Sequence, residues 1–199
     1  MLFYLIPEFV IPYLILVINC YVFKLLRIIL FKLTPSTLRN VISEFVSTLE
    51  LCSDCAELNV VWEFHGNIGY GIALFLLCLW WCDSFEDAEA CPCGPVEDVI
   101  LLGTTSDSIQ KLLGQMAGAY VTWKYTNVFW CWHLMKEHQD LHEQICYASL
   151  QVPMYHGAVI EAMITFISRI VYLESYNWNN KVANYINSIV TVILVLSGN

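Results

Sequence analysis

Charged residues are scarce in this sequence. They make up 14% of the 199 residues, whereas a soluble domain has about 25%. Lysine and arginine are especially few, nine against eighteen acidic residues, which excludes the basic groove that a nucleic acid needs. Hydrophobic residues account for 58% of the chain, and its mean hydropathy is +0.58. This balance is typical of an integral membrane protein.

Motifs of soluble enzymes and of membrane barrels are also missing. The chain has no glycine-rich phosphate loop and no Ser-His-Asp spacing, so enzyme activity is not expected. No extended alternation of polar and apolar residues indicates a barrel, which leaves α-helices as the membrane-spanning structure. We therefore expect an all-α, polytopic membrane protein.

The nine cysteines form no regular framework. Most lie in apolar runs, where a free thiol behaves as a small hydrophobic side chain, and the odd number argues against a set of disulfides. A zinc site built from Cys91, Cys93, Cys52 and Cys55 would place two ligands inside a membrane span. The pair His138 and His142, one helical turn apart, is expected on a solvated face. We expect no metal and no cofactor.

Six apolar segments follow one another, and several approach the ~20 residues that a helix needs to cross a bilayer. They lie at about 2–31, 41–61, 68–81, 108–132, 152–173 and 182–196. The first has no basic residue before its apolar core, so it is predicted to be a retained anchor and not a signal peptide. The positive-inside rule then places the basic residues that follow it on the cytosolic side: Lys24, Arg27, Lys32 and Arg39.

The stretch "DAEACPCGPVEDVILLG" at 87–103 interrupts these segments. Pro95 suits the first turn of a helix, and Glu97 and Asp98 favour its positive end. About eight helical residues extend only about 12 Å, less than half a bilayer. Two interpretations are open, an amphipathic surface helix or a re-entrant half-helix. In either case, residues 82–107 enter and leave on the cytosolic face, and the loop 136–150 lies on the opposite face.

An internal repeat favours the re-entrant interpretation. "EFVST" at 44–48 and "EAMIT" at 161–165 share the pattern Glu-x-x-x-Thr, 117 positions apart. A carboxylate within a span costs about 2.5–3.5 kcal/mol and usually faces the interior of the helix bundle. Two such patterns indicate duplicated halves, an arrangement found in channels and transporters.

These motifs together resemble the aquaporin (major intrinsic protein) family and, within it, the unorthodox superaquaporin branch. Each half of that family begins with a Glu-x-x-x-Thr helix. Its third helix has a Gln-x-x-Gly-Ala pattern, which "GQMAGA" matches with Gln115, Gly118 and Ala119. Its first pore loop carries Asn-Pro-Ala at the place of "ACPCG". The resemblance covers about residues 40–199.

The resemblance implies an aquaporin-like helical bundle with one re-entrant half-helix and an incomplete second half. Residues 1–38 would be a membrane anchor with a basic cytosolic linker. Residues 39–135 would form the first half, with the half-helix near 94–102, and residues 136–199 part of the second half. The sequence stops after "VLSGN", where the family's second pore loop would follow, so we expect a fragment or a truncated product.

Three groups of site residues follow from the resemblance. The expected pore motif is Cys91, Pro92 and Cys93, with the two cysteines at the places of the family's Asn and Ala. The residues expected to support pore loops are Glu44, Glu161 and Gln115. The glycines expected to allow close helix packing are Gly114 and Gly118. An alternative for Glu44 is a carboxylate that merely snorkels to the cytosolic interface.

The expected function is a transmembrane channel for water or small neutral solutes. The resemblance further implies a multi-pass homotetramer in the lipid bilayer of an internal membrane such as the endoplasmic reticulum, with no nucleic-acid partner. The alternative is a non-conducting structural or regulatory membrane protein. That alternative is motivated by the missing second loop and by Cys91 in place of Asn, because a thiol is only a weak hydrogen-bond donor.

Overall fold

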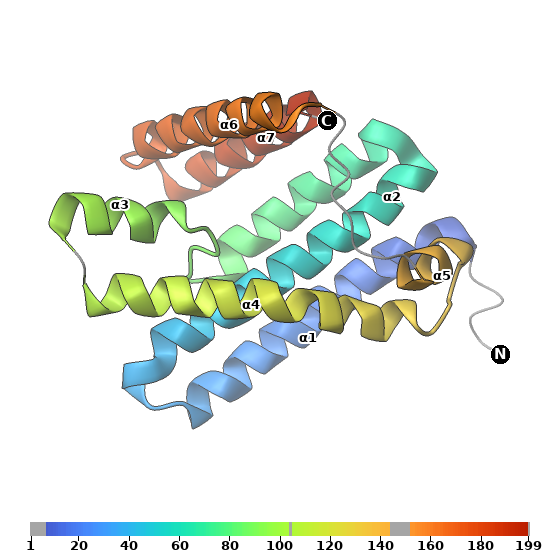
Figure 1. Cartoon of the computed structure of the whole chain (residues 1–199), viewed down its shortest axis with the longest axis horizontal. Helices are drawn as coiled ribbons and strands as arrows, with labels where there is room; N and C mark the ends of the chain where they lie inside the picture. The colour runs from blue at the N-terminus through green and yellow to red at the C-terminus, as the bar shows by residue number, and fades with distance from the viewer. Residues whose placement is uncertain (1–6, 104, 144–151, 199) are drawn as a thin grey trace.

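The computed structural model describes residues 7–103, 105–143 and 152–198 (Figure 1). Its elements are η2 Glu8–Val10, α1 Ile11–Leu33, η3 Ser36–Leu38, α2 Arg39–Ser84, α3 Cys93–Leu102, α4 Ser106–Trp130, α5 Lys136–Glu143, α6 Met154–Ser175 and α7 Asn180–Gly198. These ranges contain no strand, which confirms the predicted all-α fold.

Four helical segments are long and apolar enough to cross a membrane: Glu8–Leu33, Ser36–Ser84, Met154–Ser175 and Asn180–Gly198. The chain is therefore an integral, multi-pass membrane protein, as predicted. The helix α4, which the sequence also predicts as a span, is not one of the four. Polar residues such as Lys111, Gln115 and Lys124 are spread along it and lower its hydropathy.

The long helix α2 consists of two parts that meet at Gly66. The φ of Gly66 is 59°, a left-handed conformation that glycine adopts without steric cost. The second part turns back against the first, so that Leu58 and Val61 pack in one cluster with Leu74 and Leu77. Two of the predicted apolar segments thus form a helical hairpin.

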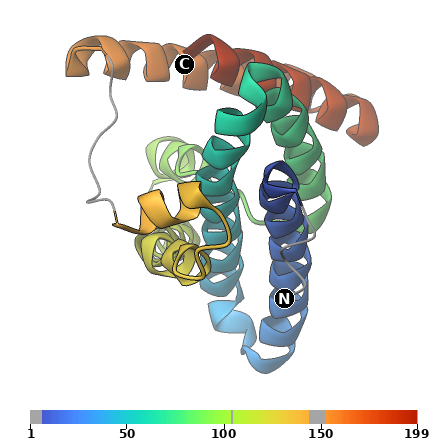
Figure 2. The same cartoon turned by 90° about the vertical axis from the view of Figure 1, so that its right-hand side faces the viewer.

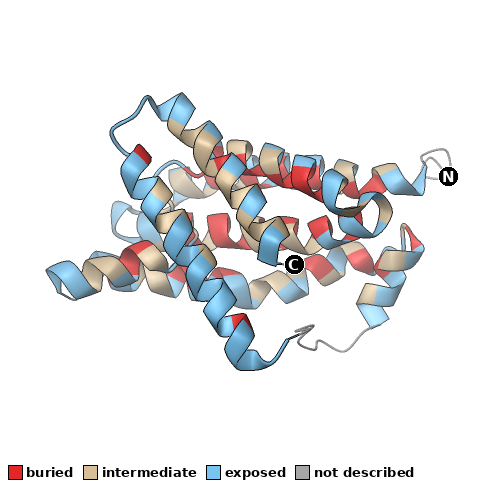
Figure 3. Ribbon diagram, turned by 90° about the horizontal axis from the view of Figure 1, so that it is seen from above, coloured by how far each residue is buried: buried red, intermediate tan, exposed pale blue. Residues whose placement is uncertain are grey.

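The helices bury polar groups and expose apolar ones. In α1, Asn19 and Arg27 are only 4% and 3% exposed, whereas Val17, Ile18 and Leu25 are more than half exposed. Figure 3 shows the buried residues along the inner faces of the bundle. This distribution is the one expected in lipid, where polar side chains face the bundle interior and apolar side chains face the hydrocarbon.

The connections lie alternately at the two ends of the bundle formed by α1, α2 and α4 (Figure 1). At one end, the Asn40 side chain donates a hydrogen bond to Asp107, so the link between α1 and α2 lies near the start of α4. At the other end, Ile11 and Val60 cluster with Met135, just before α5. This alternation is the one that the sequence-based topology requires.

The helices α6 and α7 pack side by side and lie across this bundle at a steep angle (Figure 2). Val192 and Leu196 of α7 pack against the cluster that contains Leu74 and Leu77 of the second part of α2. An ion pair between Arg169 and Glu97 joins α6 to α3. Most of α6 is exposed, including Met163 and Phe166.

Glycosylation tags placed in the loops test the membrane orientation. A tag near Glu86 is expected to stay unmodified, because the predicted topology places that loop on the cytosolic face. A tag inserted at α5 is expected to be glycosylated. The measurement is the mass shift that an endoglycosidase removes. A modified tag near Glu86 would overturn the orientation.

Candidate functional site

The connection 85–92, here called the hinge loop, leads from α2 into α3 and has a strained backbone. Glu86 and Ala90 have φ values of 52° and 48°. A residue other than glycine in this conformation costs on the order of 1–3 kcal/mol and persists only where its surroundings enforce it. The contacts of the hinge loop must therefore supply that stabilisation.

Glu44 of α2 provides the central contact. Its side chain is 1% exposed. The backbone N–H of Glu89 donates to Oε1 and that of Ala90 donates to Oε2, each at 3.0 Å. Hydrogen bonds to a charged group contribute about 1.5–3 kcal/mol each. Glu44 therefore lies inside the bundle, bound to the strained end of the hinge loop, and does not snorkel to the interface.

Gln115 of α4 joins the same group. Its Nε2 donates to Glu44 Oε2 at 2.9 Å and to the carbonyl oxygen of Cys91 at 3.0 Å. One amide thus links α4, α2 and the residue at which the expected pore motif begins. The structure brings together Glu44, Gln115 and Cys91, which the sequence places up to 71 positions apart.

The expected pore motif lies where the hinge loop enters α3. Cys91 is exposed, Pro92 is the residue before the helix, and Cys93 is its first residue. Gly94 and Pro95 are buried, whereas the far end of α3 exposes Ile100, Leu101 and Leu102.

An ion pair that is partly exposed to solvent lies at the N-terminus of α3. A Cβ added to Gly94 would lie 1.6 Å from Glu89 Oε2, so this carboxylate occupies the space beside the first turn. Glu89 Oε1 pairs with Lys111 Nζ at 2.8 Å. The carboxylate complements the positive end of the helix, and Lys111 compensates its charge.

The two glycines of α4 lie directly against the backbone of α2. A Cβ on Gly114 would approach the carbonyl oxygen of Val41 to 2.4 Å, and one on Gly118 would approach that of Phe45 to 2.6 Å. Side chains cannot fit at such distances, so the glycines set the separation of α2 and α4. This close approach also brings Gln115 within reach of Glu44.

Glu161 is exposed on α6 and has no hydrogen bond within the described part of the chain. Its role stays a prediction.

A second polar group, not predicted from the sequence, lies between α1 and α2. Asn19 Nδ2 donates to Asp54 Oδ1 at 2.6 Å and to Ser53 Oγ at 3.0 Å, and Tyr125 O–H donates to Asn19 Oδ1 at 2.6 Å. Arg27 Nη2 pairs with Glu50 Oε2 at 2.7 Å. These contacts join α1 to α2 and α4 through the interior of the bundle.

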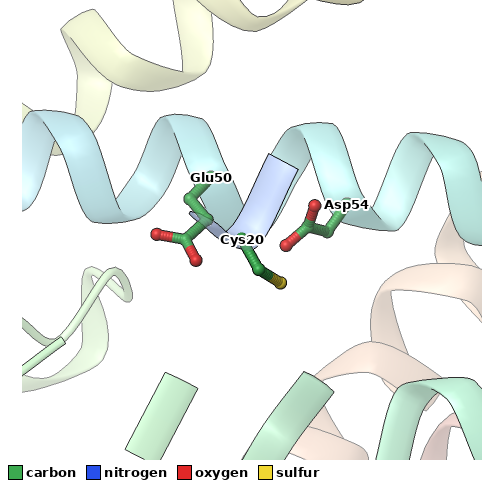
Figure 4. A group of neighbouring side chains, drawn as sticks. All are labelled: Cys20, Glu50 and Asp54. Atoms are coloured by element: carbon green, nitrogen blue, oxygen red, sulfur yellow. The ribbon is translucent and has the colours of Figure 1, made fainter. Parts of the chain in front are cut away.

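Cys20, Glu50 and Asp54 come close enough for a metal ion to be considered, with ligand atoms within 4.8 Å of one another (Figure 4). All four carboxylate oxygens already accept an N–H, however. Those of Glu50 accept from Arg27 and Trp80, and those of Asp54 accept from Asn19 and Trp81. The arrangement favours a hydrogen-bonded core over a metal centre.

Arg27 points into the bundle, where its partner Glu50 lies on the neighbouring helix. Its expected place on the cytosolic side stays a prediction. One position differs from expectation. His138, expected on a solvated face, is fully buried, and its Nε2 lies 2.9 Å from Glu57 Oε1. The apolar residues Met135 and Leu141 fold α5 against the bundle and carry His138 inward. His142 is exposed, as predicted.

One sequence signal could have revealed this second group. Glu50, Asp54 and Glu57 are spaced i, i+4 and i+7, which places three carboxylates on one face of a membrane helix. Ionisable residues within a span mark the bundle interior and call for partners.

Comparisons with known proteins give two similar curated proteins. Aquaporin-11 of Milnesium tardigradum is 28% identical over 145 residues, which is 71% of this chain and 54% of the relative. Aquaporin-12 of Mus musculus is 27% identical over 130 residues, 61% of this chain and 45% of the relative. The chain thus spans about half the length of these relatives. No family model and no solved structure matches the chain. The two relatives confirm the resemblance to aquaporins of the unorthodox branch.

Proposed function

We propose that this chain forms the first half, and part of the second, of an aquaporin-type channel for water or small neutral solutes. The observation that carries the proposal is the attachment of the hinge loop to Glu44 and Gln115. These are two of the residues to which the family resemblance assigns loop support, and the similarity to two aquaporins supports the same function.

The attachment matters because of what a re-entrant segment requires. The helix α3 has 10 residues, about 15 Å, and is too short to span a bilayer. Irregular backbone at membrane depth persists only where protein or a water-filled cavity surrounds it and its polar groups are satisfied. Glu44 satisfies two hinge-loop amides in this way. The free N–H groups and partial positive charge at the N-terminus of α3 would then orient water and repel cations.

The residues at this end of α3 differ from the family pattern. The Cys91 thiol is a weak donor, so the backbone N–H groups would carry most of the hydrogen bonding to a permeating molecule. The apolar residues exposed on α6 and α7 would face lipid or further helices of the channel. A homotetramer in an internal membrane is the assembly that the resemblance favours.

A non-conducting structural or regulatory membrane protein is the second candidate function. The exposed Cys91 at the entry to α3 favours it, because a thiol is a weaker hydrogen-bond donor to a permeating molecule than the Asn of the family pattern.

Osmotic swelling of proteoliposomes separates the two functions. Vesicles that contain the chain are expected to swell faster than vesicles of the same lipid without protein. A permeability equal to that of lipid alone, with correctly folded protein in the membrane, would favour the non-conducting function.

A further inference from the structure

Arg27 lies in α1, which precedes the region of the family resemblance, yet it contacts the start of the hinge loop. Its Nη1 donates to the carbonyl oxygen of Ser84 at 2.8 Å and to Ser84 Oγ at 2.7 Å. Its guanidinium also lies 5.2 Å from the ring centroid of Phe85, the first residue of the loop. The residue that ends α2 and the residue that begins the hinge loop are therefore both in contact with one buried cation.

These contacts compensate a specific weakness of the helix end. Ser84 is the last residue of α2, and the carbonyl groups in the last turn of a helix have no partner within the helix. Arginine can donate to such a carbonyl, and its charge is favourable at the negative end of a helix. No other charged side chain in the described part of the chain donates a hydrogen bond to Ser84.

The other half of the guanidinium is bound to the first part of α2. Nη2 donates to Glu50 Oε2 at 2.7 Å and to Ser47 Oγ at 3.3 Å. Ser47 and Glu50 are one turn and about two turns beyond Glu44 on the same helix. One rigid, planar group therefore fixes the distance between the helix that carries Glu44 and the point where the hinge loop starts.

The hinge loop is thus held at both ends. Arg27 binds Ser84, the residue directly before the loop, and lies over the ring of Phe85, whereas Glu44 binds Glu89 and Ala90 near the end of the loop. The two left-handed residues, Glu86 and Ala90, lie within this interval. A strained segment needs such restraints on both sides, because release of either end lets the backbone relax.

We propose that Arg27 is a positioning residue for the hinge loop, and that α1 thereby holds the hinge loop and α3 in place. One consequence of this role, a lower permeability when Arg27 is lost, rests on the proposed channel function. The geometric part, the placement of the hinge loop, is independent of conduction and can be measured separately.

The test uses the full chain in lipid nanodiscs and liposomes. Arg27→Met leaves Glu50 buried without its partner, so it is combined with Glu50→Gln, which removes both charges while an oxygen remains to accept from Trp80. Arg27→Lys keeps the charge beside Glu50, but a single ammonium cannot reproduce the planar fork that reaches both Glu50 and Ser84. Lys32→Met is the matched control, a basic residue of the same helix with an exposed side chain.

Amide hydrogen exchange of the segment 85–92 is the first readout. In the Arg27→Met/Glu50→Gln variant and in Arg27→Lys, the amides of Glu89 and Ala90 are expected to exchange about tenfold faster than in the unaltered chain. This factor corresponds to the loss of the hydrogen bond between the Arg27 guanidinium and the Ser84 carbonyl oxygen. Lys32→Met is expected to leave exchange unchanged. Unchanged exchange in either Arg27 variant would overturn the positioning role, since Arg27 would then only balance the charge of Glu50.

Osmotic permeability is the second readout. Permeability is expected to fall in both Arg27 variants while Lys32→Met keeps the original value. An unaltered chain that does not conduct, but whose Arg27 variants show faster loop exchange, would contradict the channel function and leave the positioning role supported. A conducting chain whose Arg27 variants keep full permeability would contradict the role of Arg27 in positioning the hinge loop for conduction.

Discussion

Replacing Glu44 with Leu is expected to destabilise the folded chain by about 3 kcal/mol or more and to open the hinge loop to protease. Three donors bind this carboxylate, the backbone N–H groups of Glu89 and Ala90 and the side-chain amide of Gln115. A buried donor without a partner costs about 1–3 kcal/mol, and leucine offers no acceptor. The measurements are the melting temperature in detergent and the rate of proteolytic cleavage around Cys91.

Glu44→Gln serves as the control for this prediction. Glutamine keeps one acceptor oxygen in the same place but removes the charge, so a smaller loss of stability is expected. Lys32→Met controls for substitutions at exposed positions and is expected to melt as the unaltered chain does. Equal stability and unchanged cleavage in Glu44→Leu would show that Glu44 does not support the loop.

Gly118→Leu is expected to cost about 3 kcal/mol, the upper end of the range for inserting atoms into a well-packed interior. The first carbon of any side chain at this position would already meet the carbonyl oxygen of Phe45 at 2.6 Å. To admit it, α4 must move away from α2, which also withdraws Gln115 from Glu44. Loss of stability should therefore be accompanied by faster amide exchange at Glu89 and Ala90.

Ala117→Leu is the matched control for Gly118→Leu. It adds a leucine to the same helix one residue earlier, on the exposed face of α4. Its melting temperature is expected to stay close to that of the unaltered chain. Equal melting of the two variants would contradict close packing of α2 and α4 at Gly118.

Much of the helical framework could be predicted from the sequence, because hydrophobic length reports membrane spans directly. The short helix α3 was also readable, since Pro95 lies in its first turn. Glu97 and Asp98 were expected in that turn as well, but they lie beyond it because the helix begins earlier, at Cys93. The sequence predicts a connection between the apolar segments 41–61 and 68–81, but it does not predict that this connection is a tight turn at Gly66. A single glycine in a polar stretch does not by itself indicate that two helices follow each other without a loop.

The contacts between helices were harder to predict. Glu44 was identified because it begins the Glu-x-x-x-Thr pattern that the sequence shares with the aquaporin family. The positive-inside rule predicts the side of the membrane on which Arg27 lies, but it takes no account of a carboxylate on another helix, so the pair with Glu50 was not predicted. His138 was wrongly expected on a solvated face. The polar composition of α5 predicts solvent exposure, and burial results from the apolar residues on its one packed face.

Reversible modification of Cys91 tests most directly whether the start of α3 lines a conducting path. A small, thiol-specific mercurial is added to proteoliposomes, and water permeability is measured before treatment, after it, and after a reducing thiol removes the adduct. Because Cys91 is exposed at the entry to α3, we expect permeability to fall with the adduct and to recover on its removal, and Cys91→Ser to be insensitive. Equal inhibition of Cys91→Ser, or no effect on the unaltered chain while mass spectrometry shows the adduct on Cys91, would contradict a pore at this site.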